Sequence, residues 1–173
     1  ADLSYSNLSN SSIRNTSLKN TILDEAQLNN ARANNINISK SSLVKAGMKN
    51  IVMRSSVLSM SNFSEANIEE GDLSHSDAHG SVFVDTKLVD AQFIRSNLRQ
   101  SNFMNADLSN TNFSSADLSG TDFTGAKLIN TNFFNADLRY SNLRFAKILN
   151  INIDKAILCK TKLPWGIRDD DCK

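Results

Sequence analysis

Two histidines are the first residues whose type and spacing could do chemistry. His75 and His79 lie four residues apart, with Asp72 and Asp77 close by in the sequence. Imidazole and carboxylate groups together are common ligands of Zn²⁺ and related cations. These four residues, however, follow none of the fixed ligand spacings of known metal motifs. We therefore expect solvated surface histidines, with no metal and no other cofactor.

Other catalytic groups are scarce. Serine is plentiful, but no serine is accompanied by the base and the orienting group that a nucleophile requires. The sequence also lacks a glycine-rich loop of the kind that cradles a phosphate. These observations predict that the protein is not an enzyme.

The charges nearly cancel over 173 residues, a length that suits one domain. Nineteen basic and 18 acidic residues leave a formal charge of +1, so we expect no direct nucleic-acid binding. The longest apolar run covers only residues 156–159, far too short to cross a bilayer, and we expect no membrane partner. The distribution is uneven, since residues 65–90 carry seven acids and one base. Residues 1–64 and 138–163 are net basic, which predicts an acidic waist between basic ends.

The elements that position these groups follow a five-residue period. All 33 positions from Leu3 to Leu163 in steps of five are apolar, and the residue two places before each is almost always Ala, Ser, Thr or Gly. Neither a helix nor a flat strand keeps positions five apart on one face. The chain must therefore turn a corner every five residues.

Longer ladders show how many corners close one coil. Phenylalanine recurs every 20 residues in two series, so four pentapeptides make one turn of a square solenoid. We predict that both series lie in the core, on opposite walls: Phe63, Phe83, Phe103, Phe123, and Phe93, Phe113, Phe133.

This pattern resembles the pentapeptide-repeat family, written A(D/N)LXX. Residues 106–110 (Ala-Asp-Leu-Ser-Asn), 116–120 (Ala-Asp-Leu-Ser-Gly) and 136–140 (Ala-Asp-Leu-Arg-Tyr) match it fully. The resemblance implies an all-β fold, a right-handed quadrilateral parallel β-helix of about eight coils over residues 1–163. Residues 164–173 then form a C-terminal cap and tail.

The two ends differ in the sequence. We expect Pro164 and Trp165 to cap the C-terminal end, with Trp165 covering the last core layer and the charged tail leaving the rod. At the other end Ala1 is already in register, which predicts an open first coil covered by upstream residues, by a partner or by a second copy in a dimer.

The cysteines lie at the C-terminal end, and Cys159 is expected to point outward. The stretch from Leu158 to Cys172 is similar to the Cys-x-Thr-x-Met/Leu-Pro-x-Gly…Cys ending of family members from cyanobacteria and the chloroplast lumen. That resemblance implies a Cys159–Cys172 disulfide, and with it export to a periplasm or lumen rather than a cytoplasmic location. Two unpaired thiols are the alternative.

The most direct function is a non-enzymatic module that presents a rigid rod surface to a protein partner. Acidic residues of the waist and outward apolar residues are the predicted contacts: Glu69, Glu70, Asp90, Val84, Met104, Ile129 and Leu149. Phe134, Tyr140 and Phe145 also point outward, on different faces.

Two alternatives remain open. The family resemblance implies a DNA mimic that protects or inhibits DNA gyrase, as some members do, although the near-zero charge and the low acidic belt disfavour it here. The chain could also be the β-helical domain of a larger bacterial effector.

Overall fold

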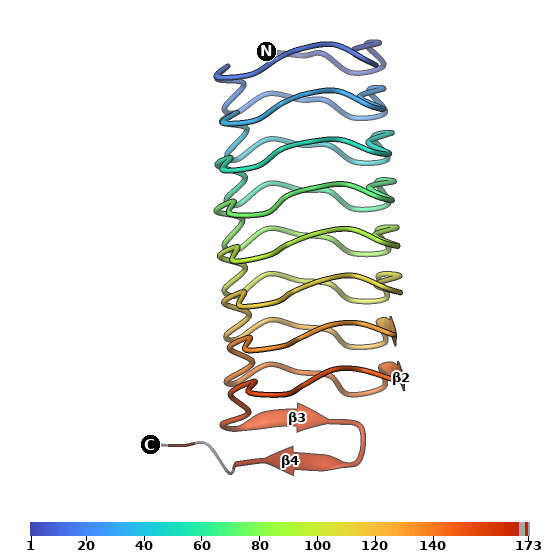
Figure 1. The fold of residues 1–173 in the computed structure, drawn as a ribbon. Helices are drawn as coiled ribbons and strands as arrows, with labels where there is room; N and C mark the ends of the chain where they lie inside the picture. Colours follow the sequence, from blue (N-terminus) through green and yellow to red (C-terminus); the bar gives the residue numbers. More distant parts are fainter. Residues whose placement is uncertain (170–171, 173) are drawn as a thin grey trace.

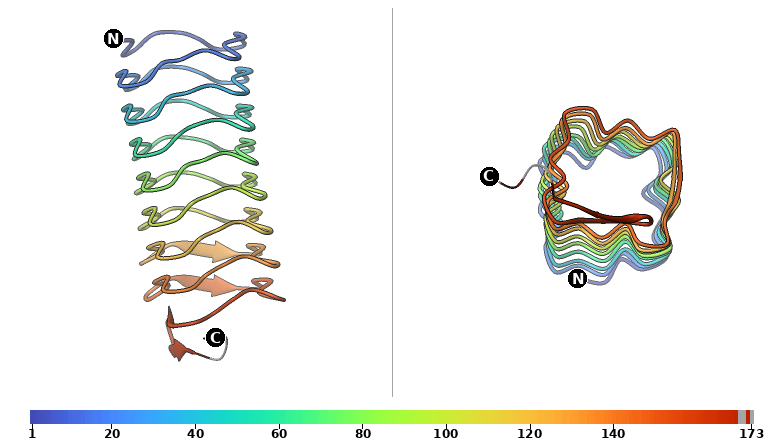
Figure 2. Two further views of the ribbon diagram at one scale, coloured as in Figure 1. Left: turned by 90° about the vertical axis from the view of Figure 1, so that its left-hand side faces the viewer. Right: turned by 90° about the horizontal axis from the view of Figure 1, so that it is seen from below.

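In the computed structural model the chain winds into a straight rod of stacked coils (Figure 1). The structure describes residues 1–169 and 172. Parallel bridges join each coil to the next with a constant register of 20 residues, from Asp2↔Ile22 to Asn142↔Lys162. Seen from below, the coils superpose as a four-sided outline (Figure 2). The predicted coil of four pentapeptides is therefore confirmed.

The pairing is mostly between single residues, so few strands are long enough to be named. Strand β1 (Lys127–Ile129) pairs in parallel with β2 (Lys147–Leu149), one coil later. Strand β3 (Thr161–Leu163) pairs antiparallel with β4 (Gly166–Arg168) at the C-terminal end. Among the described residues no helix is long and apolar enough to cross a membrane.

Each corner is a tight turn that repeats the same backbone geometry. Every fifth residue from Tyr5 to Lys160 has a φ between 51° and 72°. The turn closes when the backbone N–H three residues after a core residue donates to that residue's C=O, as from Ala106 to Phe103 at 3.1 Å. Such turns need positive φ at their third position, which Asn and Gly tolerate best. This requirement explains the Asn ladders of the sequence.

The small residues and the Asp or Asn residues have separate roles in holding the coils. The buried Thr111 hydroxyl donates to the C=O of Leu88, one coil earlier, at 2.8 Å. Asp117 accepts a hydrogen bond from the backbone N–H of Ser119 at 3.1 Å, which fixes the start of the turn. The Asp117 contact satisfies a backbone N–H that the bridges leave open, and the Thr111 contact adds a second hydrogen bond to a C=O that already accepts from the N–H of Ala91.

The core is a double column of phenylalanine rings. All seven predicted core phenylalanines are fully buried, and rings 20 residues apart stack with centroids 4.7 to 5.4 Å apart. Rings of the two columns meet edge to face, as Phe83 and Phe93 do at 5.8 Å and 82°. Both arrangements are favourable for aromatic pairs. In the first coil Leu3, Leu8, Ile13 and Leu18 are only partly buried.

The C-terminal end differs from the predicted cap. Trp165 does not cover the core, because Leu163 pairs with Gly166 and leaves Pro164 and Trp165 as the two turn residues of a hairpin. Trp165 is 65% exposed. The residues after it fold back as β4 beneath the last coil instead of leaving the rod at once (Figure 1). The hairpin, rather than the tryptophan, closes this part of the rod.

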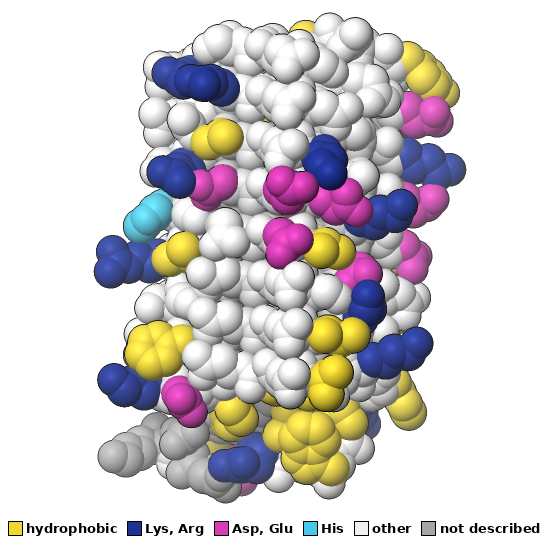
Figure 3. Space-filling view, turned by 45° about the vertical axis from the view of Figure 1, so that its right-hand side comes forward, with side chains coloured by type: hydrophobic (Ala, Val, Ile, Leu, Met, Phe, Trp, Pro, Cys, Tyr) yellow, Lys and Arg dark blue, Asp and Glu magenta, His cyan; other side chains and the backbone are white. Residues whose placement is uncertain are grey.

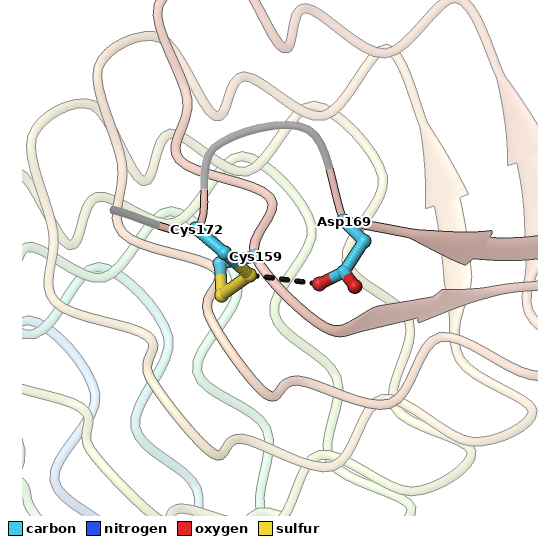
Figure 4. Close-up of side chains that lie close together, drawn as sticks. All are labelled: Cys159, Asp169 and Cys172. Atoms are coloured by element: carbon cyan, nitrogen blue, oxygen red, sulfur yellow. Dashed lines mark hydrogen bonds between the residues drawn. A yellow bond between two sulfur atoms is a disulfide. The ribbon is translucent and has the colours of Figure 1, made fainter.

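Cys159 directly follows the core residue Leu158 in the last coil. It is only 5% exposed, because the chain returning after β4 covers it. It forms a disulfide with Cys172, with their Cα atoms 4.8 Å apart (Figure 4). The bond ties the tail beyond β4 to the last coil.

Candidate partner-binding surface

The rod has four sides, and the predicted contact residues occupy two adjacent ones. We call the side that ends in β3 the first side, and the side that contains β1 and β2 the second side. The 20-residue register places two of the contacts on the first side and five on the second: Val84 and Met104, then Glu69, Glu70, Asp90, Ile129 and Leu149. These two sides, with the corner that joins them and the corner that follows the second side, form a surface that we call the front edge. In Figure 3 the corner that follows the second side faces the viewer, and the corner that joins the two sides lies at the right-hand outline.

Acidic side chains gather at mid-height along the front edge (Figure 3). Several are neutralised by lysines of the coil before. Lys49 Nζ lies 3.3 Å from Glu70 Oε1 and 3.8 Å from Glu69 Oε2, and Lys45 Nζ lies 3.7 Å from Glu65 Oε2. No such ion pair involves Asp90 within residues 1–169 and 172. The acidic waist of residues 65–90 is therefore less negative than its seven acids suggest, because coil stacking places bases directly beside several of them.

The predicted apolar pairs are stacked as expected but differ in exposure. Val84 and Met104 lie 20 residues apart on the first side, and both are half-buried. Ile129 and Leu149 are direct partners in the β1–β2 pairing. Leu149 is 55% exposed because no regular coil follows it on the second side. The accessible apolar area thus increases toward the C-terminal end.

The prediction missed the largest apolar group of the front edge. Phe145 is 81% exposed and Ile167 is 61% exposed, close to Trp165 at the hairpin turn. A hollow of about 360 Å³ opens between them, lined by Arg144, Phe145, Leu163, Pro164, Gly166 and Ile167. Hydrophobic side chains cover the same end of the rod in Figure 3. Phe145 at a corner position, where Asn is the commonest residue, is the signal that could have revealed this group.

The other two outward aromatics differ from Phe145 in their contacts. Lys155 Nζ lies 5.3 Å from the ring centroid of Phe134, and Lys160 Nζ lies 5.7 Å from that of Tyr140. These cation–π contacts give both rings a partner within the rod. In the part of the chain that the structure describes, the Phe145 ring has no such cation.

The histidine region is engaged in local contacts. His79 Nδ1 lies 2.9 Å from Asp77 Oδ1, and the Asn97 amide donates to the same oxygen at 2.9 Å. Among the described residues, only Cys159, Asp169 and Cys172 bring three potential metal ligands within 4.8 Å (Figure 4). Two of these are joined in the disulfide, which leaves no thiolate for a cation.

Comparison with known proteins agrees with the coil geometry. The family profile described as pentapeptide repeats (8 copies) matches residues 1–39 and, in overlapping segments, 61–152. A search of curated proteins found no match.

Two solved structures share the fold. HetL, a pentapeptide repeat protein involved in heterocyst differentiation regulation from the cyanobacterium Nostoc sp., aligns with a TM-score of 0.65 and 26% identity. That alignment covers 97% of this chain and 85% of HetL. QnrB1, a plasmid-mediated fluoroquinolone resistance protein, aligns with a TM-score of 0.61 and 14% identity, over 84% of this chain and 87% of that chain. At 14% identity the second likeness concerns the fold alone.

Proposed function

The chain belongs to the pentapeptide-repeat family, and from that premise we propose that it is a non-enzymatic interaction module whose front edge binds a protein partner. The observation that carries this proposal is the convergence of exposed apolar and acidic side chains on two adjacent sides of the rod. Interaction sites on proteins combine apolar anchors with a polar surround, as this edge does.

The rigidity of the rod supports the same proposal. The front edge is built on coils that are joined on both sides by repeated backbone hydrogen bonds, so little conformational entropy is lost when it binds. A modest patch can then bind specifically. We also infer that the coil is right-handed and makes eight turns over residues 1–163, which the family fold and the unbroken register support.

The location of the protein belongs to the proposal as well. A Cys159–Cys172 disulfide suits an oxidising compartment, and we infer that the protein is exported to a periplasm or lumen.

Site-specific photo-crosslinking tests the proposed surface. A photoreactive amino acid is placed at Met104 on the first side, and in a matched protein at Ser119, which is also half-buried but lies away from the front edge. Each protein is irradiated in an extract of the native host. The proposal expects one discrete adduct from position 104, weakened by the double change Glu69→Lys and Asp90→Lys. Equal adducts from both positions would contradict it.

A further inference from the structure

On the second side of the rod, no strand pairs below the last coil among the described residues. With a register of 20, residues 166–170 of a regular repeat would lie beneath residues 146–150. Here Gly166–Arg168 is instead diverted into β4, which pairs with β3 on the first side. The second side therefore ends at β2 without a following strand among the described residues.

The backbone groups of this edge have no strand partner in the described part of the chain. Two coils earlier, the N–H groups of Leu108 and Asn110 donate to the next coil at 2.9 and 2.8 Å. The equivalent N–H groups of Ile148 and Asn150 make no such bond to residues 1–169 or 172. The C=O of Ala146 likewise receives no bond of the kind that the C=O of Ala126 receives from Lys147 at 2.9 Å. An edge with free donors and acceptors is a template for another strand.

The side chains along this edge specify what the added strand should carry. Lys127 Nζ lies 3.0 Å from Asp107, whereas Lys147, the next residue in that column, follows Lys127 and has no ion-pair partner among residues 1–169 and 172. Next to it Ile148 is partly buried and Leu149 is 55% exposed. An acid opposite Lys147, followed by two apolar residues opposite Ile148 and Leu149, would extend all three columns, since directly opposed residues form the stabilising pairs of a sheet.

The hollow lies where such a strand would enter. Phe145 and Arg144 line it and directly precede the second side of the last coil. An apolar side chain just before the added strand would therefore fill it, with Arg144 adding positive charge to its lining.

We propose that the open second-side edge of the last coil binds an acidic–apolar protein segment as a parallel β-strand, with an apolar anchor in the adjacent hollow. This inference rests on the proposed function and names the partner chemistry for one end of the front edge. Charge complementarity favours a protein segment with an acid at a defined position, because Lys147 follows the Asp107–Lys127 ion pair in its column and has no acid beside it among the described residues.

The test uses a fluorescein-labelled synthetic peptide with the sequence Gly-Leu-Ala-Asp-Leu-Leu-Asn-Gly and the whole protein. We expect saturable binding by fluorescence anisotropy. N-methylation of the peptide's Asp nitrogen, which would donate to Ala146, should weaken binding at least tenfold. Amide exchange at Ile148 and Asn150 should slow at least tenfold in the complex.

Charge reversal supplies the matched control. The Lys147→Glu variant should bind the original peptide at least tenfold more weakly than the wild-type protein does. It should bind a peptide with Lys in place of Asp about as well as the wild-type protein binds the original. Lys155→Glu makes the same charge change in the same coil, away from the second side, and should change the affinity less than twofold. Circular dichroism spectra that match the wild-type spectrum would show that both variants fold.

Three results would overturn the strand assignment. The first is the absence of peptide binding up to 1 mM, and the second is binding that survives N-methylation. The third is that the protein self-associates, or sediments with phosphatidylglycerol vesicles, and that added peptide does not reverse this. A Met104 crosslink that persists in Lys147→Glu would show that the proposed function survives such a failure. If the wild-type protein gave no crosslinked adduct from position 104, the proposed function itself would be contradicted.

Discussion

Phe83 and Phe103 stack face to face, with ring centroids 4.7 Å apart and planes 4° from parallel. The two residues are 20 positions apart, so the pair is direct evidence that four pentapeptides make one coil. Phe103 also meets Phe93 and Phe113 edge to face from the opposite wall. Phe123 stacks on its other face, so rings contact Phe103 on both faces and from the opposite wall.

Truncation of this ring should be costly. Phe103→Ala is expected to lower the free energy of unfolding by about 3–5 kcal/mol, because neighbouring coils tied by backbone bonds cannot collapse into the cavity. Phe103→Leu keeps most of the volume and should cost about 1–1.5 kcal/mol. Urea unfolding measures both. Equal, small losses for the two variants would contradict the stacked core.

The corner residues should be sensitive to the shape of the side chain. Asn110 has φ 59°. Asn110→Val should destabilise by about 1–2 kcal/mol, because a β-branched residue is disfavoured in left-handed backbone. Asn110→Gly should be close to neutral, since it relieves strain but loses the amide contact that Asn130 donates at 3.1 Å. Thermal denaturation of the two variants checks the order. A tolerated valine would be inconsistent with the turn geometry.

Acid should destabilise the rod through aspartates that precede core residues. For Asp107, partial burial opposes ionisation, but hydrogen bonds from Ser109 and Lys127 outweigh it and lower its pKa. The same balance lowers the pKa of Asp72 and Asp137. A carboxyl whose folded pKa is depressed stabilises the fold above its unfolded pKa of about 3.9 and loses that contribution as the pH falls through the folded value.

The free energy of unfolding should therefore change little between about pH 7 and 5 and fall below about pH 4. Asp107→Asn keeps an acceptor for the turn but cannot titrate, and it should flatten the acid limb. Urea titrations at several pH values measure the slope. An unchanged slope in this variant would show that Asp107 does not contribute to it.

The disulfide should be present in the oxidised protein and should act locally. Thiol titration under denaturing conditions should detect two thiols only after reduction. In the chain-entropy picture, closing the Cys159–Cys172 loop with its separation of 13 residues stabilises by about 3 kcal/mol. Cys172→Ser should accelerate amide exchange in β4 while exchange in the central coils stays the same. Free thiols in protein purified under oxidising conditions would argue against export.

The rod should not act on DNA gyrase. The acidic waist is neutralised in part by Lys45 and Lys49, and Asp72 is paired with Arg54, so the described coils carry no extended negative stripe like that of a duplex. A supercoiling assay with and without a quinolone should show neither inhibition nor protection at micromolar protein. Activity in that assay would replace the proposed function with the DNA-mimic alternative.

The repeat alone determined the coil, the pairing register and the identity of the core. These follow from sequence because every pentapeptide meets the same local demands: one large apolar residue inside, one small residue that lets backbones approach, and one corner residue with positive φ. The Phe63 and Phe93 series could be assigned to opposite walls because each series repeats every 20 residues and the two are offset by ten, which is half a coil.

Only the tertiary structure decided how the rod ends and where its surface groups meet. Past Leu163 no repeat constrains the chain, so the pairing of Leu163 with Gly166, the exposed Trp165 and the covered Cys159 could not be predicted from a pattern. Side-chain pairing between coils, such as Lys49 with Glu70, depends on rotamers that no register specifies. The open edge at Ile148 exists for the same reason, because β4 takes the chain that would have covered it.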